Sequence, residues 1–423
     1  MPTRRAWITV ASLLLFISAC GESDKGTTVL RVANWGGPAV DPSFLRLERE
    51  IREGFERRHP GVRVQMEHIP GPGQYEPKLL MMFVSGHAPD VIHLDASSAA
   101  VFIDYNVLAD LTPQINEDPE FKPATYFKNV FDIARRGNAV YAIPLDFTPM
   151  VMVYNKQLFD LARVPYPQEG WTWQDFLERC RRLTETKPGT DKPARYGFNF
   201  VNWMPGWVPW IWLNGADVLS PDGRHAVGYF DAPESIEAIQ FLVDLIIKHR
   251  VAPNLTESTA AGVDLFRAGR AAMHLTGHWS LIEYRADGMD IGIVGLPTNT
   301  QRPETVMYES GLAITRTSSH AELAWEYITY MTGEAVQRRR VSTGLAISAH
   351  QAVAQEYADT ELERAFLSAV AYARPPWGAR VARYPFCEDL GREMFDDILH
   401  GGVPVADAMH RTAALIEAEV AQP

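Results

Sequence analysis

The sequence predicts an α/β fold, from three observations: strands and helices alternate in its N-terminal part, the chain is long, and its second half is more helical. It has 423 residues, more than one compact core usually serves, so we expect two domains. Hydrophobic residues make up 46% and charged residues 22%, which is ordinary for a globular protein. Alternating strands and helices are typical of a largely parallel sheet with helices on its faces.

The N-terminal elements follow one another with short connections. Residues 29–33 predict a first strand, and apolar residues at helical spacing predict a helix over 43–58. His59-Pro60-Gly61 ends that helix, and 62–69 form a second strand. A helix near 77–85, a break at Gly86 and a third strand at 91–94 complete the alternation.

The later part of the chain is mainly helical. A helix over 172–184 opens with Thr172 as its N-cap, and 233–249 predict a strongly amphipathic helix. Strands are expected near 271–275, 290–294 and 312–315, and the chain from His320 onward is mostly helical.

The first residues resemble a bacterial lipoprotein signal. Arg4 and Arg5 precede an apolar run over 7–16 and the small residues before Cys20. The run is too short to span a membrane, which takes about 20 residues. We therefore expect a signal peptide at 1–19, lipid on the sulfur of Cys20, a tether at 20–28, and a membrane-anchored, extracytoplasmic protein. The alternative is an ordinary signal peptide with an incidental Cys.

The charge of the chain excludes one class of partner. Its net charge is −12, from 52 acidic and 40 basic residues, so a nucleic acid, which needs a basic face, is not expected.

Cys180 lies on the apolar face of a predicted helix, which favours a buried thiol, although the sequence cannot fix whether it pairs with Cys387.

A tryptophan cluster is the first candidate for a site. Four of the 11 Trp lie within ten residues, at Trp203, Trp207, Trp210 and Trp212. Flat aromatic rings suit the C–H face of a sugar and commonly line ligand pockets. A core helix packing large rings is an equally good interpretation, since Trp is heavily buried on average.

The remaining motifs are weaker. Asp146 lies in a polar turn between two short apolar strands, where it could accept hydroxyl hydrogen bonds or bond its own backbone. His274 and His278 are four apart, but Gly277 and a strand intervene and no third ligand is near, so no metal site is expected. The sequence contains no nucleophile elbow, P-loop or dinucleotide fingerprint.

Together these segments resemble the extracellular solute-binding proteins of ABC importers, the family that includes maltose- and multiple-sugar-binding proteins. The matching pieces cover nearly all of the mature chain and follow the family's order. They are the lipobox, 55–64, 86–91, 141–146, 153–156, 171–176, 265–273, 277–279, Arg374-Pro375 and the final helix near 406–416.

The resemblance implies a two-lobed, periplasmic-binding-protein type II-like fold with hinge strands and a ligand cleft between the lobes. One lobe would hold 29–142 plus 277–330, and the other 145–270 plus 335–423. Hinges would fall near 145–151, 271–279 and 330.

The resemblance also implies a set of ligand-binding residues. Trp35 and Trp279 would stack on sugar faces, Asp95 and Asp146 would accept hydroxyl hydrogen bonds, Trp207 or Trp210 would add a wall from the other lobe, and Arg374 would donate. Glu309 departs from the family pattern, which favours small residues there. It either changes the local backbone or adds an acceptor.

The expected function is capture of a sugar or oligosaccharide by lobe closure and its delivery to the membrane subunits of an ABC importer. The protein would be a monomer with no enzymatic activity, no cofactor and no metal. The alternatives are a binding protein for another ligand, such as a polyamine or a sugar phosphate, and an extracellular carbohydrate hydrolase whose two carboxylates come from distant positions.

Overall fold

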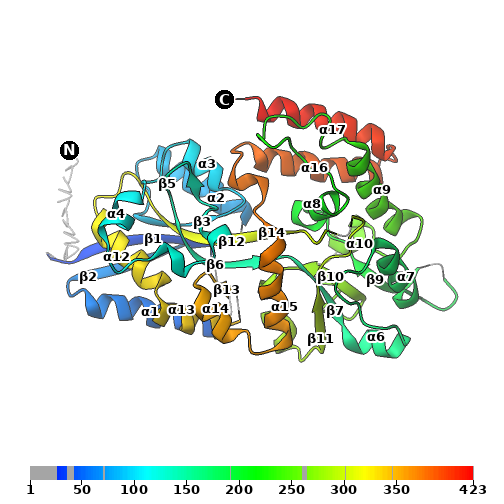
Figure 1. The fold of residues 1–423 in the computed structure, drawn as a ribbon, viewed down its shortest axis with the longest axis horizontal. Helices are drawn as coiled ribbons and strands as arrows, with labels where there is room; N and C mark the ends of the chain where they lie inside the picture. The colour runs from blue at the N-terminus through cyan, green and yellow to red at the C-terminus, as the bar shows by residue number, and fades with distance from the viewer. Residues whose placement is uncertain are drawn as a thin grey trace, which may run out of the picture.

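The computed structural model describes residues 26–35, 42–69, 72–190, 192–259, 264–300, 302–344 and 346–422. Within them the chain forms two main sheets, each covered by helices, which lie side by side in Figure 1. The predicted α/β class is confirmed. The predicted signal peptide, Cys20 and most of the tether lie outside the described residues. None of the helices in the described ranges is both long and apolar enough to cross a bilayer.

The larger sheet has the strand order β13-β6-β12-β3-β1-β2. Its strands are β1 (Thr28–Trp35), β2 (Val62–Ile69), β3 (Val91–Asp95), β6 (Ile143–Pro149), β12 (Thr305–Ile314) and β13 (Ile347–Ser348), with β14 (Ala373–Arg374) beside the start of β12. β1 is parallel to β2 and β3, whereas β12 is antiparallel to β3 and β6. We call this sheet and the helices packed on it the first lobe.

Helices cover both faces of this sheet. α1 (Pro42–Arg58) supplies the crossover that the parallel pair β1–β2 needs, and its buried Ile51 and Phe55 pack with Leu30 and Val32 of β1. Leu79 of α2 (Pro72–Val84) packs with Ala33 on the opposite face. The other elements of this lobe are α3 (Ala99–Asp104), α4 (Thr112–Glu117), η1 (Pro123–Thr125), α5 (Lys128–Phe131), the ribbon β4 (Arg135–Arg136) and β5 (Ala139–Val140), α12 (Ala321–Thr332), α13 (Glu334–Val341) and α14 (Gln351–Tyr357).

The smaller sheet has the order β11-β7-β10-β9-β8 and forms the second lobe. Its strands are β7 (Val151–Asn155), β8 (Glu185–Thr186), β9 (Pro193–Asn199), β10 (Ala271–Thr276) and β11 (Ile291–Val294). Around it lie α6 (Lys156–Ala162), α7 (Trp173–Leu183), α8 (Met204–Leu213), α9 (Pro233–Ile247), α10 (Leu255–Thr259), η2 (His278–Ser280), α11 (Leu281–Ala286), α16 (Tyr384–Leu399) and α17 (Val405–Val420).

Local sequence explains how α7 meets this sheet. Thr172 and Asp175 form a capping box at the start of α7, as the predicted N-cap requires. Gly197 of β9 leaves room for the helix, because a Cβ there would lie 2.4 Å from the Cα of Cys180. Cys180 and Cys387 are both free, buried thiols.

The chain passes between the lobes at three places. β6 leads directly into β7 at Met150, within the predicted hinge at 145–151. β11 in the second lobe leads to β12 in the first. After α15 (Glu361–Ala369), which contacts strands of both sheets, the chain continues through η3 (Val370–Tyr372), β14 and η4 (Trp377–Ala379) into α16.

The sheets differ from the predicted lobe ranges at two points. β13 pairs with β6, and Val336 of α13 packs in the core of the first lobe, although 335–423 were assigned to the second. β11 pairs with β7 in the second lobe, although 277–330 were assigned to the first. The other two predicted hinges, 271–279 and 330, lie within β10, η2 and α12. An apolar helix face shows that a helix packs, but does not show on which sheet.

Candidate ligand-binding cleft

Three neighbouring strands of the first lobe place Asp95, Ser310 and Asp146 side by side. Ser310 of β12 is the register partner of Asp95 on β3 and of Asp146 on β6. The Asp95 Oδ1 accepts a hydrogen bond from the Ser97 backbone N–H at 2.7 Å and another from the Ser97 hydroxyl. Burial raises the pKa of Asp95, and these two hydrogen bonds oppose the rise. This row brings two of the predicted acceptors to the strands on either side of β12.

Glu309, next to Ser310, is buried, with 3% of its surface exposed. Its Oε1 lies 2.5 Å from where a Cβ on Gly311 would be, so the glycine two positions on makes room for the carboxyl. Its Oε2 has no hydrogen-bond partner among the described residues. Burial, and then the charges of Asp95 and Asp146, raise the pKa of Glu309 well above its usual value.

Asp146 differs from the other two carboxylates because it has a cationic partner. Its Oδ2 lies 2.8 Å from the Nη2 of Arg340 on α13, and both side chains are largely buried. Burial raises the pKa of Asp146, and the Arg340 charge opposes that rise. Part of the hydrogen-bonding capacity predicted for a ligand is therefore used within the first lobe.

The second lobe contributes Glu388, which the sequence analysis did not single out. Burial and then the charge of Asp95 raise its pKa to about 8. Burial and then Asp95 also raise the pKa of Glu76, on α2, to about 6. Glu388 lies on α16 of the second lobe and Asp95 ends β3 of the first, so the charge of a carboxylate in one lobe raises the pKa of a carboxyl in the other. An acidic residue on an amphipathic helix is normally solvated, so no sequence pattern marks the environment of Glu388.

Two predicted aromatic residues lie partly exposed beside other rings. The ring of Trp279 is 6.2 Å from that of Trp203 and 6.5 Å from that of Tyr308, both edge to face. Trp279 thus joins the tryptophan cluster of the second lobe to β12 of the first. Trp35, at the end of β1, stands edge-on to Tyr75 at 5.2 Å and to His93 at 5.3 Å.

The prediction that Trp207 or Trp210 forms a cleft wall is wrong for this conformation. Both side chains are 0% exposed and belong to the core of the second lobe. Trp210 packs against Phe176 at 5.3 Å, and Trp207 against Phe395 at 5.5 Å. α8 is apolar on all sides and buried throughout, so its sequence carries no periodicity that would distinguish a cleft face from a core face.

Arg374 is not a free donor, contrary to its predicted role. Its guanidinium contacts Asp217 at 2.5 Å and Glu304 at 3.0 Å, and lies 4.1 Å from the ring centroid of Trp212. The Nε1 atoms of Trp212 and Trp377 each donate to the Asp217 Oδ1 at 2.8 Å. Arg374 therefore fixes the crossing segment at β14 against the second lobe.

The two lobes touch one another where these residues gather. A Cβ on Gly378 of η4 would lie 1.7 Å from the Ser97 carbonyl oxygen, so this segment packs directly on the residues after β3. The cavity between α8 and β12, lined among others by Val208, Trp212 and Tyr308, has a volume of about 10 Å³. That volume holds at most one water molecule. A sugar could enter this site only after the lobes separate.

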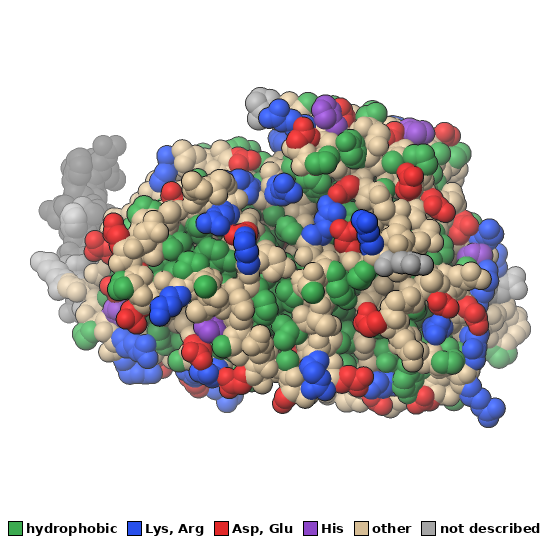
Figure 2. Space-filling view, viewed as in Figure 1, with side chains coloured by type: hydrophobic (Ala, Val, Ile, Leu, Met, Phe, Trp, Pro, Cys, Tyr) green, Lys and Arg blue, Asp and Glu red, His purple; other side chains and the backbone are tan. Residues whose placement is uncertain are grey.

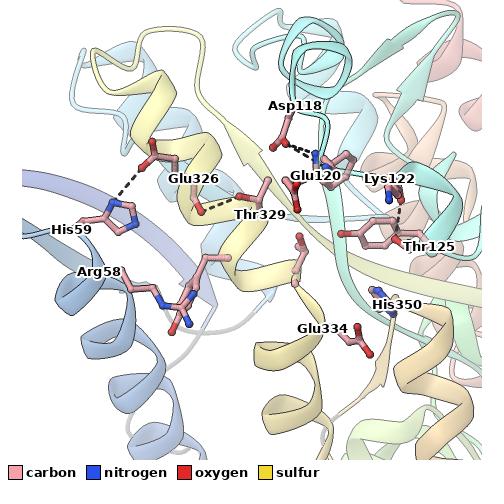
Figure 3. A pocket seen from close by; sticks show the side chains of 15 residues that line it. Arg58, His59, Asp118, Glu120, Lys122, Thr125, Glu326, Thr329, Glu334 and His350 are labelled. Atoms are coloured by element: carbon pink, nitrogen blue, oxygen red, sulfur yellow. Dashed lines mark hydrogen bonds and ion pairs between the residues drawn. The ribbon is translucent and has the colours of Figure 1, made fainter.

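A second cavity lies away from this region, in the first lobe between α1, α4 and α12 (Figure 3). It has a volume of about 430 Å³, and several of its charged groups already have partners. His59 contacts Glu326 at 3.2 Å, and Asp118 accepts from the Nε1 of Trp325 at 3.0 Å. This cavity contains none of the predicted ligand-binding residues.

The outer surface shows no field of one sign on the face in view. In Figure 2, Lys and Arg side chains are interspersed with Asp and Glu over both lobes. With a net charge of −12, this face does not resemble a nucleic-acid-binding surface.

Two α/β lobes joined by crossing strands, with acidic and aromatic side chains where they meet, define a two-lobed binding protein. The family model of bacterial extracellular solute-binding proteins matches residues 41–338, and the chain belongs to this family. The predicted family is therefore confirmed.

Similar structures and sequences agree with this assignment. An ABC substrate-binding protein from Listeria monocytogenes, solved with cycloalternan, is 24% identical with a TM-score of 0.83, covering 93% of this chain and 98% of that one. A maltodextrin-binding domain from Bdellovibrio bacteriovorus, bound to maltotriose, is 18% identical with a TM-score of 0.75, covering 92% and 99%. These likenesses confirm the two-lobed fold.

Relatives similar in sequence include an uncharacterized lipoprotein and an oligosaccharide-binding protein. An uncharacterized lipoprotein from Streptomyces antibioticus is 29% identical over 46% of this chain and 41% of its own length. The arabinooligosaccharide-binding protein of Halalkalibacterium halodurans is 24% identical over 74% of this chain and 69% of that protein.

Proposed function

We propose that this protein binds a sugar or oligosaccharide between its two lobes, closes around it, and presents it to the membrane subunits of an ABC importer. The observation that carries the proposal is the meeting of acceptors and rings from both lobes. The charge of Asp95 in the first lobe raises the pKa of Glu388 in the second, and the ring of Trp279 in the second lobe lies 6.5 Å from that of Tyr308 in the first.

This combination suits a carbohydrate. Carboxyl groups exchange hydrogen bonds with sugar hydroxyls: a protonated carboxyl, the form that the raised pKa of Glu388 favours at neutral pH, both donates and accepts, and a contact to an ionised carboxylate is worth about 1.5–3 kcal/mol. Aromatic rings cover the apolar C–H faces of sugars. Because the acceptors belong to different lobes, the ligand binds the closed arrangement more tightly than the open one and so shifts the population toward closure.

The names of relatives support the same ligand class. An arabinooligosaccharide-binding protein and a maltotriose-binding protein from Pyrococcus abyssi are among the related sequences. Family membership and the acceptors shared between lobes together favour binding without turnover. A hydrolase remains the alternative, and release of product from any oligosaccharide would establish it.

Among non-sugar ligands, a polyamine or a sugar phosphate is the alternative.

The proposal includes a lipid on Cys20, which would hold a monomer at the outer side of a membrane. The Streptomyces relative bears the name lipoprotein, and the N-terminal sequence carries the lipobox pattern.

A thermal-shift screen over mono- and disaccharides tests the proposal. A sugar at 100 times its Kd should add about 2.7 kcal/mol to the free energy of unfolding. If polyamines raise the melting temperature and no sugar does, the protein is a polyamine-binding protein and the proposed sugar-binding function is wrong.

A further inference from the structure

The cavity of the first lobe, between α1, α4 and α12, is lined by charged side chains that the fold leaves unpaired. Its volume is about 430 Å³, which is within the range of ligand-binding pockets. Arg58, Glu120 and Lys122 line it, and none of these three forms an ion pair with another residue in the described ranges. Another lining carboxylate, that of Glu334, is paired with Arg338.

The unpaired charges lie on two sides of the cavity (Figure 3). Arg58 ends α1, and its guanidinium lies 4.9 Å from the ring centroid of Tyr330, so it is held over an aromatic ring. Glu120 and Lys122 belong to the segment between α4 and η1. The cavity therefore presents two cations and one carboxylate, and the complementary occupant carries two carboxylates and one ammonium group.

The chain carries such a segment directly before its first described residue. Glu22, Ser23, Asp24 and Lys25 bring two carboxylates and one ammonium group in four consecutive positions. They belong to the tether that the sequence predicts between Cys20 and the fold.

The described chain begins beside the cavity. The Thr28 N–H donates to the Gly61 carbonyl at 2.7 Å, and the Gly26 carbonyl oxygen lies 3.6 Å from where a Cβ on Gly61 would be. Gly61 is two residues beyond His59, which lines the cavity. Four residues reach at most about 14 Å, which exceeds the edge of a cube with the volume of the cavity.

We propose that residues 22–25 bind in this cavity, with the carboxylates of Glu22 and Asp24 toward Arg58 and Lys122 and the ammonium of Lys25 toward Glu120. Ion pairs at exposed side chains are individually weak. The segment is joined to the fold beside its site, however, so its effective concentration there is about millimolar.

Binding of the tether would set how the protein stands at the membrane. With the lipid proposed for Cys20, the first lobe would be held next to the anchor, while the second lobe would move when the cleft opens and closes. This consequence rests on the proposed lipid, whereas binding of residues 22–25 depends neither on the lipid nor on a sugar.

The test is electron paramagnetic resonance of a nitroxide on Cys20, in the full mature chain produced without lipid. Cys180 and Cys387 are buried, so the label reacts at Cys20. We expect a strongly immobilised component in the spectrum. This component should decrease in about 1 M salt, because salt screens exposed charges.

Two double variants locate the effect. Arg58→Ala with Lys122→Ala should lower the ratio of bound to free tether at least about threefold, because two ion pairs are lost. Arg57→Ala with Lys128→Ala removes the same charge from exposed side chains that pair elsewhere, with Glu53 and Asp132, and should leave the ratio unchanged.

A charge swap tests the contact itself. Arg58→Glu with Lys122→Glu should abolish the immobilised component, and adding Glu22→Lys and Asp24→Lys to that variant should restore it, because the pairs re-form with reversed sign.

Four outcomes would overturn the inference. They are a label equally mobile in the wild type and in the cavity variant, an equal loss in both double variants, a charge swap that restores nothing, and a mobile label in a protein that binds the free peptide Glu-Ser-Asp-Lys in calorimetry. The last would show that the cavity takes an acidic peptide from solution and that the tether is not its occupant. None of these measurements involves a sugar, so failure here leaves the proposed function standing.

Discussion

Replacing Glu388 by Gln should change how the stability of the protein depends on pH. The carboxyl of Glu388 has a pKa of about 8 in the folded protein, against 4.5 for an ordinary Glu. Between these two values the unfolded chain has lost the proton while the folded protein keeps it. The free energy of unfolding of the wild type therefore falls as pH rises from 4.5 toward 8, and Gln removes this part of the fall.

The size of the effect follows from the same two values. At about 1.4 kcal/mol per pH unit, the interval from 4.5 to about 8 corresponds to at most ~5 kcal/mol. The side chain of Glu388 is half-buried, so water screens the charge and we expect about 2 kcal/mol. The neighbouring charges that set this value are Asp95 and Glu76 across the cleft, and Arg392 and Asp389 on α16 itself.

Urea unfolding at about pH 5 and about pH 8.5 measures the difference. Glu388→Gln should gain about 2 kcal/mol relative to the wild type between the two pH values, and Glu393→Gln, an exposed change on the same helix, should gain none. Identical pH profiles for Glu388→Gln and the wild type would refute the reasoning, since Glu388 would then ionise normally in the folded protein.

Three further predictions follow from the same geometry. Trp279→Ala should weaken sugar binding at least about tenfold while lowering stability by about 1–3 kcal/mol, from its two ring contacts; calorimetry showing unchanged affinity would remove Trp279 from the site. Arg340→Ala leaves Asp146 buried and unpaired and should cost about 3–5 kcal/mol, whereas Arg339→Ala, at an exposed pair, should cost about 0–1 kcal/mol; equal costs in urea unfolding would contradict this. Cys20→Ser should abolish partitioning into detergent and leave sugar affinity intact, and a variant that still partitions would exclude the lipid anchor.

The fold was largely predictable because its signals are local. The apolar spacing of Ile51 and Phe55 specified α1, the N-cap residue Thr172 specified the start of α7, and the alternation of strands and helices specified the sheet of the first lobe. The lobe to which α13 and β13 belong was not predictable, because their pairing with β6 depends on contacts between residues far apart in sequence.

The site was predictable only in part. Asp95 ends β3, as expected, whereas Asp146 lies within β6 instead of in the predicted turn. The Arg340 partner of Asp146 lies 194 residues away and has no sequence signal. Trp207 and Trp210 could not be separated from Trp203, because every face of α8 is apolar. Glu388 was missed because its special environment arises only when the second lobe meets Asp95.

The central claim is that a sugar, held by side chains of both lobes, stabilises the closed protein. Small-angle scattering of the mature protein, with and without the sugar that gives the largest thermal shift, tests this most directly. The radius of gyration should fall on binding, toward the roughly 22 Å expected for a compact chain of this length. An unchanged radius of gyration at saturating sugar would contradict it.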